Sequence, residues 1–147
     1  MEMENKKNEY LISVTGIQEV DGEKDKIELQ TVGKYIMKPD HAYIGYKEYD
    51  EENPSVSSNN IIKVENDNKV TIIRNGEIQS RLILEKGRRH QCHYRTMVGD
   101  MMIGVFADTI NNELRNNGGK LHVSYSLDFN NELISNNEFY IDVQEKR

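Results

Sequence analysis

The sequence contains a single cysteine, Cys92, no tryptophan and no long apolar run. One cysteine excludes an internal disulfide, which favours a reducing compartment. No apolar stretch approaches the roughly 20 residues that a membrane-spanning helix needs, so we expect no membrane insertion. Residues 1–9 are charged and polar and have no apolar signal core behind them, which argues against export. These absences predict a cytoplasmic protein.

The chain also lacks an excess of positive charge. It carries 25 acidic and 19 basic residues, and its net charge is −6. Nonspecific nucleic-acid binding requires neutralisation of phosphates, so this balance argues against nucleic acid as a partner. Basic residues nevertheless outnumber acidic ones within 74–95, and this local excess leaves room for a contact with a small anion, RNA or a protein. The arginines that would form this basic outer strip are Arg74, Arg81, Arg89 and Arg95.

At 147 residues the chain fits one domain, because a single hydrophobic core is adequate for that size. Its hydrophobic fraction of 36% and charged fraction of 30% are polar for a globular protein, yet Ile, Val, Leu and Tyr are too frequent for a disordered chain. A single-layer barrel suits this composition, because about half of every strand faces water. We expect a flexible N-terminal segment over residues 1–8 and one β-barrel domain over residues 9–147.

Apolar and polar residues alternate with a period of two, and turn signals such as Asp21-Gly22 and Asn130-Asn131 interrupt the alternation at short intervals. This pattern is typical of an all-β sandwich or barrel. About eight to ten sequential strands with one dry face favour an antiparallel up-and-down barrel, since closure leaves no exposed strand edge. The expected strands cover residues 9–20, 26–38, 41–49, 60–66, 69–74, 77–85, 89–97, 100–114, 120–129 and 133–144.

The turn at Asn75-Gly76 gives the strongest hairpin signal, because both residues tolerate the positive φ of a type I′ turn. A two-residue loop there places Ile73 opposite Ile78, and directly opposed residues share a face of the sheet. We therefore expect both isoleucines to face inward. The same register places Arg74 opposite Glu77 as an ion pair that faces solvent.

The next two turns must preserve the same inward face. A two-residue loop at Lys86-Gly87 would place apolar side chains opposite polar ones, so we predict a three-residue loop at Lys86-Gly87-Arg88. This loop places Ser80 opposite Tyr94 and keeps the apolar side chains on one face. A two-residue loop at Val98-Gly99 then places Tyr94 opposite Ile103. The expected inward face of this region consists of Ile73, Ile78, Ser80, Leu82, Leu84, His90, Cys92, Tyr94, Thr96, Met101, Ile103 and Val105.

Several short segments, spread from Tyr10 to about Glu145, support a family assignment. They are Gly33-Lys34-Tyr35, Arg74-Asn75-Gly76 through Ser80-Arg81, Tyr94-Arg95-Thr96 with Gly99 and Gly104, Gly118-Gly119-Lys120-Leu121 with Tyr125, and Asn137-Glu138-Phe139. In these segments the chain resembles the YwiB-like family of small uncharacterised bacterial proteins. The resemblance implies a calycin (lipocalin-like) β-barrel and brings no settled activity with it. Secreted lipocalins open with a Gly-x-Trp signature, which this chain lacks. An inference that the protein transports a small hydrophobic molecule would therefore rest only on the similarity of the fold.

The tetrapeptide His90-Gln91-Cys92-His93 carries the residue types of a zinc site or an activated thiol. On a strand, however, His90 and Cys92 point one way and His93 the other, so a zinc site would need His41 or His122 as a further ligand. No glycine-rich turn or strand-to-helix elbow lies beside Cys92 to supply an oxyanion hole. A buried cysteine that acts as a small hydrophobe is the favoured interpretation. We predict no catalytic residue, no metal and no cofactor, and a hydrolase-type enzyme is the third alternative for function.

Five polar residues are expected to face the apolar interior. They either hydrogen-bond one another and buried water, or line a pocket in the barrel mouth that holds one small ligand. The leading hypothesis is a non-enzymatic barrel that binds a small, partly apolar molecule, and the second is a protein- or RNA-interaction module that uses the basic outer strip. The oligomeric state stays open. The expected ligand contacts are Ser80, His90, Tyr94, Thr96 and Tyr125.

Overall fold

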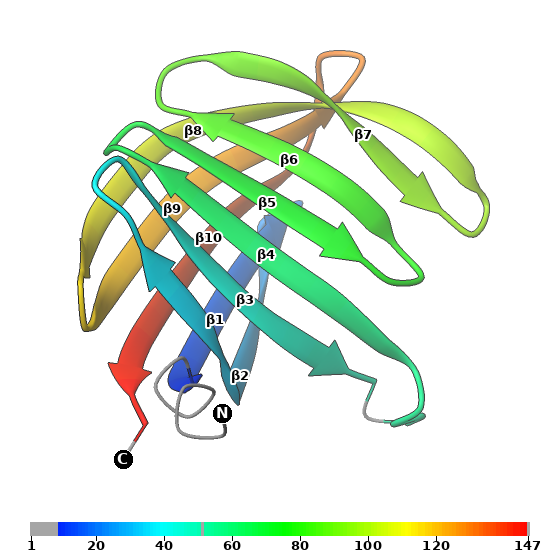
Figure 1. Cartoon of the computed structure of the whole chain (residues 1–147). Helices are drawn as coiled ribbons and strands as arrows, with labels where there is room; N and C mark the ends of the chain where they lie inside the picture. Colours follow the sequence, from blue (N-terminus) through cyan, green and yellow to red (C-terminus); the bar gives the residue numbers. More distant parts are fainter. Residues whose placement is uncertain (1–8, 51, 147) are drawn as a thin grey trace.

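The computed structural model describes residues 9–50 and 52–146, so the flexible segment expected over residues 1–8 lies outside the described residues. Within these ranges the chain forms an all-β closed barrel of ten antiparallel strands (Figure 1). No helix long and apolar enough to cross a membrane occurs in this part of the chain. The strands are β1 (Glu9–Val20), β2 (Glu23–Met37), β3 (His41–Tyr49), β4 (Ser57–Glu65), β5 (Lys69–Asn75), β6 (Gln79–Glu85), β7 (Arg89–Thr96), β8 (Gly99–Arg115), β9 (Gly118–Phe129) and β10 (Glu132–Glu145).

Each strand pairs with its neighbours in sequence, and β1 pairs with β10 to close the barrel. The start of β1 and the end of β10 lie side by side, where Tyr10 is opposite Glu145 (Figure 1). The prediction of an all-β, antiparallel up-and-down barrel is therefore confirmed. Two of the connecting turns have the paired positive φ angles of type I′ hairpins, with φ of 51° and 82° at Asp21-Gly22 and 52° and 68° at Asn130-Asn131.

The strands form because apolar and polar residues alternate along them. On β10, for example, Phe139, Ile141 and Val143 are buried, while Tyr140 faces outward and is substantially exposed. A β-bulge between Ala107 and Thr109 shifts the alternation of the long strand β8, so that Ala107 and Ile110 are both buried. One inward face thus runs continuously around the barrel.

Directly opposed residues form rows that circle the interior. Two neighbouring rows are entirely apolar, and their members are largely buried. Together with residues such as Val123 and Ile141 from the facing strands, they form the hydrophobic core in one half of the barrel. The first row is Ile44, Ile62, Ile72 and Leu82, and the second is Ala42, Val64, Val70 and Leu84.

The hairpin between β5 and β6 corrects a predicted register. Arg74 pairs with Ser80 and Ile73 with Arg81, so the connection is longer than the two-residue turn expected at Asn75-Gly76. The shift changes the register by an odd number of residues, which exchanges the two faces of β5. Ile73 therefore lies on the outer face, and Arg74 turns toward the interior.

The other two registers preserve the predicted inward face. Ser80 pairs with Tyr94, as expected from a three-residue loop. Between β7 and β8 the turn is Met97-Val98, one residue earlier than expected, so that Tyr94 lies opposite Met101 and not Ile103. This change of two residues leaves every side chain on its predicted face.

Candidate functional site inside the barrel

Beyond the two apolar rows, the next row of inward residues is polar. It crosses five adjacent strands, β3 to β7, and each member lies directly opposite the next. The facing wall of the barrel carries a second row, in which Tyr125 on β9 is opposite Asn137 on β10, and Asn137 is opposite Gln18 on β1. Both rows lie toward the end of the barrel that holds the β5–β6 and β7–β8 turns. The first row consists of Tyr46, Asn60, Arg74, Ser80 and Tyr94.

These two rows enclose a cavity of about 620 Å³ that reaches the mouth of the barrel. Its floor is apolar, with Ile62, Ile72 and Leu82 from one wall and Phe139 from the other. Gly16 on β1 also faces the cavity, and a Cβ added there would meet no atom within 4 Å. The cavity therefore combines an apolar floor with a polar upper wall.

Two hydrogen-bond donors in the polar row have no partner among the described residues. Asn60 is only 5% exposed, and its Nδ2 group is buried without a hydrogen bond. The Arg74 Nε group is likewise buried and unpartnered, although the guanidinium as a whole is half-buried. Its Nη2 lies 3.6 Å from the Glu48 carboxylate, beyond hydrogen-bond distance. In contrast, Asn137 on the facing wall donates to the Ser135 hydroxyl at 2.9 Å.

Three tyrosines converge on this cavity from different strands. Burial raises the pKa of Tyr46 to about 12, with a further contribution from the nearby Glu48 carboxylate, and the charge on Arg74 acts in the opposite direction. Burial also raises the pKa of Tyr125 to about 12, and Tyr94 reinforces the shift. The phenols of Tyr46 and Tyr125 are therefore protonated at neutral pH and can donate hydrogen bonds.

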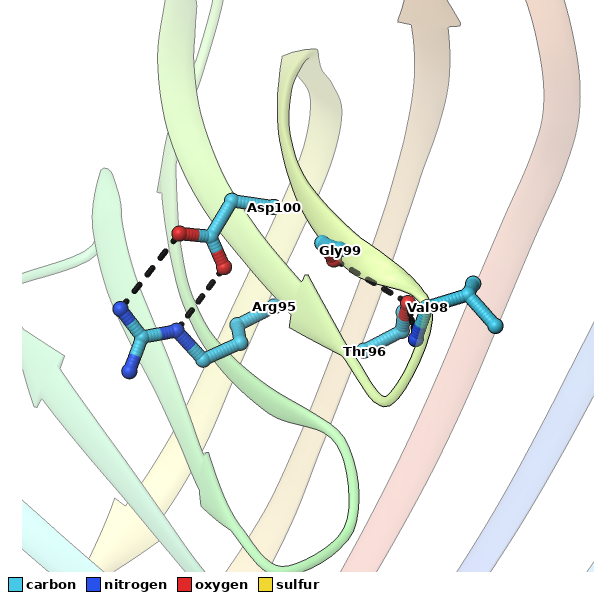
Figure 2. Close-up of polar contacts among 5 residues, drawn as sticks. All are labelled: Arg95, Thr96, Val98, Gly99 and Asp100. Carbon is cyan, nitrogen blue, oxygen red and sulfur yellow. Dashed lines mark hydrogen bonds and ion pairs between the residues drawn. The ribbon is translucent and has the colours of Figure 1, made fainter.

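The structure separates the five interior residues predicted from the sequence. Ser80, Tyr94 and Tyr125 line the cavity. Thr96 does not, because its hydroxyl donates to the Gly99 carbonyl at 3.1 Å and accepts from the Val98 amide at 3.3 Å in the β7–β8 turn (Figure 2).

His90 is also absent from the cavity wall. Its Nε2 lies 2.9 Å from the Glu85 carboxylate, near the loop that connects β6 and β7. That loop is at the end of the barrel opposite the polar rows. Thr96 and His90 were predicted to contact a ligand, but in the structure they interact with neighbouring residues outside the cavity.

The basic outer strip is interrupted. Arg74 was expected on it but faces the cavity, because of the register of the β5–β6 hairpin. Arg89 forms a two-bond ion pair with Asp128 at 2.6 and 2.9 Å. Arg95 pairs with Asp100 at 2.8 Å (Figure 2). Arg81 lies on the outer face opposite Ile73.

Cys92 is a core residue. It is 3% exposed, burial raises the pKa of its thiol, and its sulfur accepts a hydrogen bond from the Ile83 amide at 3.4 Å. His93 lies opposite Met102 on the outer face, so the histidine and the thiol point to different sides of the sheet. In residues 9–50 and 52–146, no three His, Cys, Asp or Glu side chains are grouped as a metal site would require.

Three further polar residues of the cavity, Tyr46, Asn60 and Asn137, were not predicted from the sequence. A signal for Asn60 was present, because Ser58, Asn60, Ile62 and Val64 alternate with outward residues along β4. Extending the inward face from β5 into β4 would have placed Asn60 inside, but only with the correct register for β5.

A larger hollow, of about 780 Å³, lies elsewhere and is lined partly by side chains of the outer face. There the His122 ring stacks on Tyr140 with centroids 4.2 Å apart, and its Nε2 is 3.2 Å from the Glu138 carboxylate. These polar groups already have partners. The interior cavity is therefore the better candidate for a site.

The fold and this site define a small closed β-barrel with a partly polar cavity at one mouth. The chain belongs to the family described as a domain of unknown function, DUF1934, whose model matches residues 12–141. It is similar to the uncharacterised β-barrel protein YwiB of Bacillus subtilis (strain 168), with 23% identity over 121 residues and 82% of each chain covered. The crystal structure of the B. subtilis ywiB protein matches with a TM-score of 0.81 and 19% identity, over 97% of this chain and 94% of that one. The predicted resemblance is confirmed, and the structural likeness shows the fold alone.

Proposed function

We propose that this protein binds a small, partly apolar molecule inside its barrel. The observation that carries the proposal is the cavity of about 620 Å³ between the two polar rows. Ligand pockets typically measure about 300–1,000 Å³ and combine apolar walls with a few well-placed polar groups. This cavity has that composition, with Ser80, Tyr94 and Tyr125 as polar contacts.

Gly16 supports the proposal from the backbone side. Glycine weakens a strand, because it loses more conformational freedom on folding than other residues and packs no side chain. At this position it leaves the space open that any larger side chain would fill. A barrel whose interior only had to be packed would be more stable with an apolar side chain there.

The basic outer strip receives less support as a binding surface. Two of its three outward arginines, Arg89 and Arg95, already pair with carboxylates. A strip that binds phosphates or acidic partners would need those charges free. A cytoplasmic location belongs to the same proposal and is supported by the single free cysteine.

The first experiment is native purification followed by mass spectrometry for a co-purifying small molecule. It is repeated with Gly16→Leu, which fills the cavity, and with Gly45→Leu, whose added side chain points to the outer face of β3. We expect a stoichiometric ligand in the wild-type protein and in Gly45→Leu, and its loss in Gly16→Leu. The proposal would be refuted if the wild-type protein carried no co-purifying molecule and if no compound in a broad panel of metabolites and lipids raised its melting temperature.

A further inference from the structure

The chemical nature of the ligand follows from the two unpartnered donors. Asn60 and Arg74 lie directly opposite each other on β4 and β5, so their side chains leave the sheet at neighbouring points of the same wall. Buried polar groups in proteins almost always have hydrogen-bond partners. The Asn60 Nδ2 and Arg74 Nε groups have none among the described residues, although both residues line the cavity.

A ligand that satisfies both groups must present acceptors, because an N–H group only donates. It must also suit the positive charge of Arg74. A carboxylate meets both requirements, since its two oxygens lie in one plane and accept two separate hydrogen bonds, the geometry that a guanidinium favours. The protonated hydroxyl of Tyr46, which lies directly opposite Asn60, adds a third donor to the same wall.

The acidic side chains nearby do not prevent a ligand carboxylate from binding beside Asn60 and Arg74. Glu48 is the nearest partner of Arg74, but its carboxylate is 3.6 Å away and 39% exposed, so it can turn to water when another anion binds. Asp25, Lys26 and Glu138 lie at the rim of the cavity, where opposite charges are mixed and water screens them.

The walls indicate the body of the ligand. Four aromatic rings surround the cavity, and two of them, Tyr125 and Phe139, meet edge to face with centroids 6.2 Å apart. Two aromatic rings that stack with an offset or meet edge to face gain energy beyond that of their buried area, and an aromatic ligand can form such contacts with these side chains. The other two rings are Tyr46 and Tyr94.

We propose that the barrel binds an aromatic monocarboxylate whose ring lies between the tyrosines above the apolar floor. The Asn60 and Arg74 side chains turn toward the ligand, so that its carboxylate accepts hydrogen bonds from Arg74 Nε and Asn60 Nδ2. The inference rests on the proposed function, because it names the class of ligand for the same cavity. It assigns to Asn60 a binding role that the sequence did not suggest.

Calorimetric titration with matched probes tests this inference. The probes are naphthoate, its neutral amide, naphthalenesulfonate and the aliphatic carboxylate decanoate. We expect the wild-type protein to bind naphthoate about tenfold or more tightly than each of the other three. Arg74→Gln and Asn60→Leu should each remove most of the preference for naphthoate over the amide, while the affinity for the amide changes by less than about twofold.

Arg81→Gln, an outward arginine on the neighbouring strand, is the matched control and should keep the preference. Melting temperatures identify any variant that fails to fold, and Arg74→Lys then replaces Arg74→Gln, since it keeps the charge without the Nε donor. Equal binding of naphthoate and amide would overturn the carboxylate and leave the proposed cavity function intact. If naphthalenesulfonate bound as tightly as naphthoate, the requirement for a planar carboxylate would be wrong. If decanoate bound as tightly as naphthoate, the requirement for an aromatic ring would be wrong. Binding of no probe, together with an empty native protein, would overturn both proposals.

Discussion

Asn60 on β4 and Arg74 on β5 face each other across adjacent strands, and each carries a buried N–H group that no other described residue satisfies. Such a pair destabilises the fold in the absence of a ligand, because desolvation of an unpaired polar group costs about 1–3 kcal/mol. It persists in natural proteins mainly where function requires it, since sites that bind or react often sacrifice stability.

The first prediction concerns this loss of stability. Asn60→Leu, which replaces the unpartnered amide by an apolar group of similar size, should raise the free energy of unfolding by about 1 kcal/mol or more. Asn137→Leu is the control, because the Asn137 amide donates to Ser135, and its loss should lower stability by about 1–2 kcal/mol. Urea denaturation measures both changes. A loss of stability in Asn60→Leu as large as that in Asn137→Leu would show that Asn60 is satisfied in the free protein.

Most strand boundaries were predictable to within a few residues, because alternation and turn residues are local signals in the sequence. The prediction of which face of β5 points inward was wrong for a physical reason. Its segment Thr71-Ile72-Ile73-Arg74 has adjacent isoleucines, so either face can be read as apolar. The Asn75-Gly76 dipeptide then suggested the wrong choice. In the structure neither residue has a positive φ, and Gly76 packs against Ser58.

What decides the register of β5 is a contact between residues distant in sequence. Ile72 continues the apolar row that begins with Ile44 and Ile62, and this row fixes which isoleucine points inward. The gain from burying Ile72 in that row outweighs the turn preference of one dipeptide. The position of Arg74 inside the barrel depends on the same choice, which explains why the binding site was harder to predict than the fold.

The second prediction concerns the Arg89–Asp128 pair, which lies directly over Gly104 on the intervening strand. A Cβ at Gly104 would collide with both the guanidinium and the carboxylate. Gly104→Ala should therefore break the ion pair and destabilise the protein. This loss is notable because glycine usually weakens a strand, so that its replacement by alanine would otherwise not be expected to destabilise it. We expect Gly104→Ala and Asp128→Asn each to cost about 1 kcal/mol, and the double variant to cost much less than their sum. Fully additive costs, measured by urea denaturation, would show that Gly104 acts independently of the ion pair.

The third prediction is a pH dependence of stability. Hydrogen bonds from Arg89 lower the pKa of Asp128, so the folded state holds the proton less tightly than the unfolded state. This carboxylate therefore stabilises the fold above its unfolded pKa of about 3.9, and the contribution is lost as the pH falls through the lower folded value. The difference in unfolding free energy between wild type and Asp128→Asn should be constant from about pH 7 to pH 5 and shrink below about pH 4.

Asp100 provides the comparison for this pH effect. Its pKa is also lowered, by Arg95, but both side chains of that pair are well exposed, and solvent screens their interaction. Asp100→Asn should therefore change stability less than Asp128→Asn at neutral pH. An Asp128→Asn difference that grows on acidification would mean that the carboxylate is not stabilised in the folded state.

The last prediction concerns the junction between β6 and β7, where only Gln79–Arg95 and Ser80–Tyr94 are paired in the ladder. Beyond them the Cys92 sulfur accepts the Ile83 amide hydrogen bond that a strand carbonyl would otherwise accept. Because the thiol is buried and its pKa is raised, it should react with an aromatic disulfide reagent only when the barrel opens, and at a rate that rises with urea. Cys92→Ala removes both the packing atom and the acceptor, and it should cost about 2–3 kcal/mol. Rapid modification in the native protein, at the rate of a free thiol, would instead show that the β6–β7 junction opens readily and gives a second route to the interior.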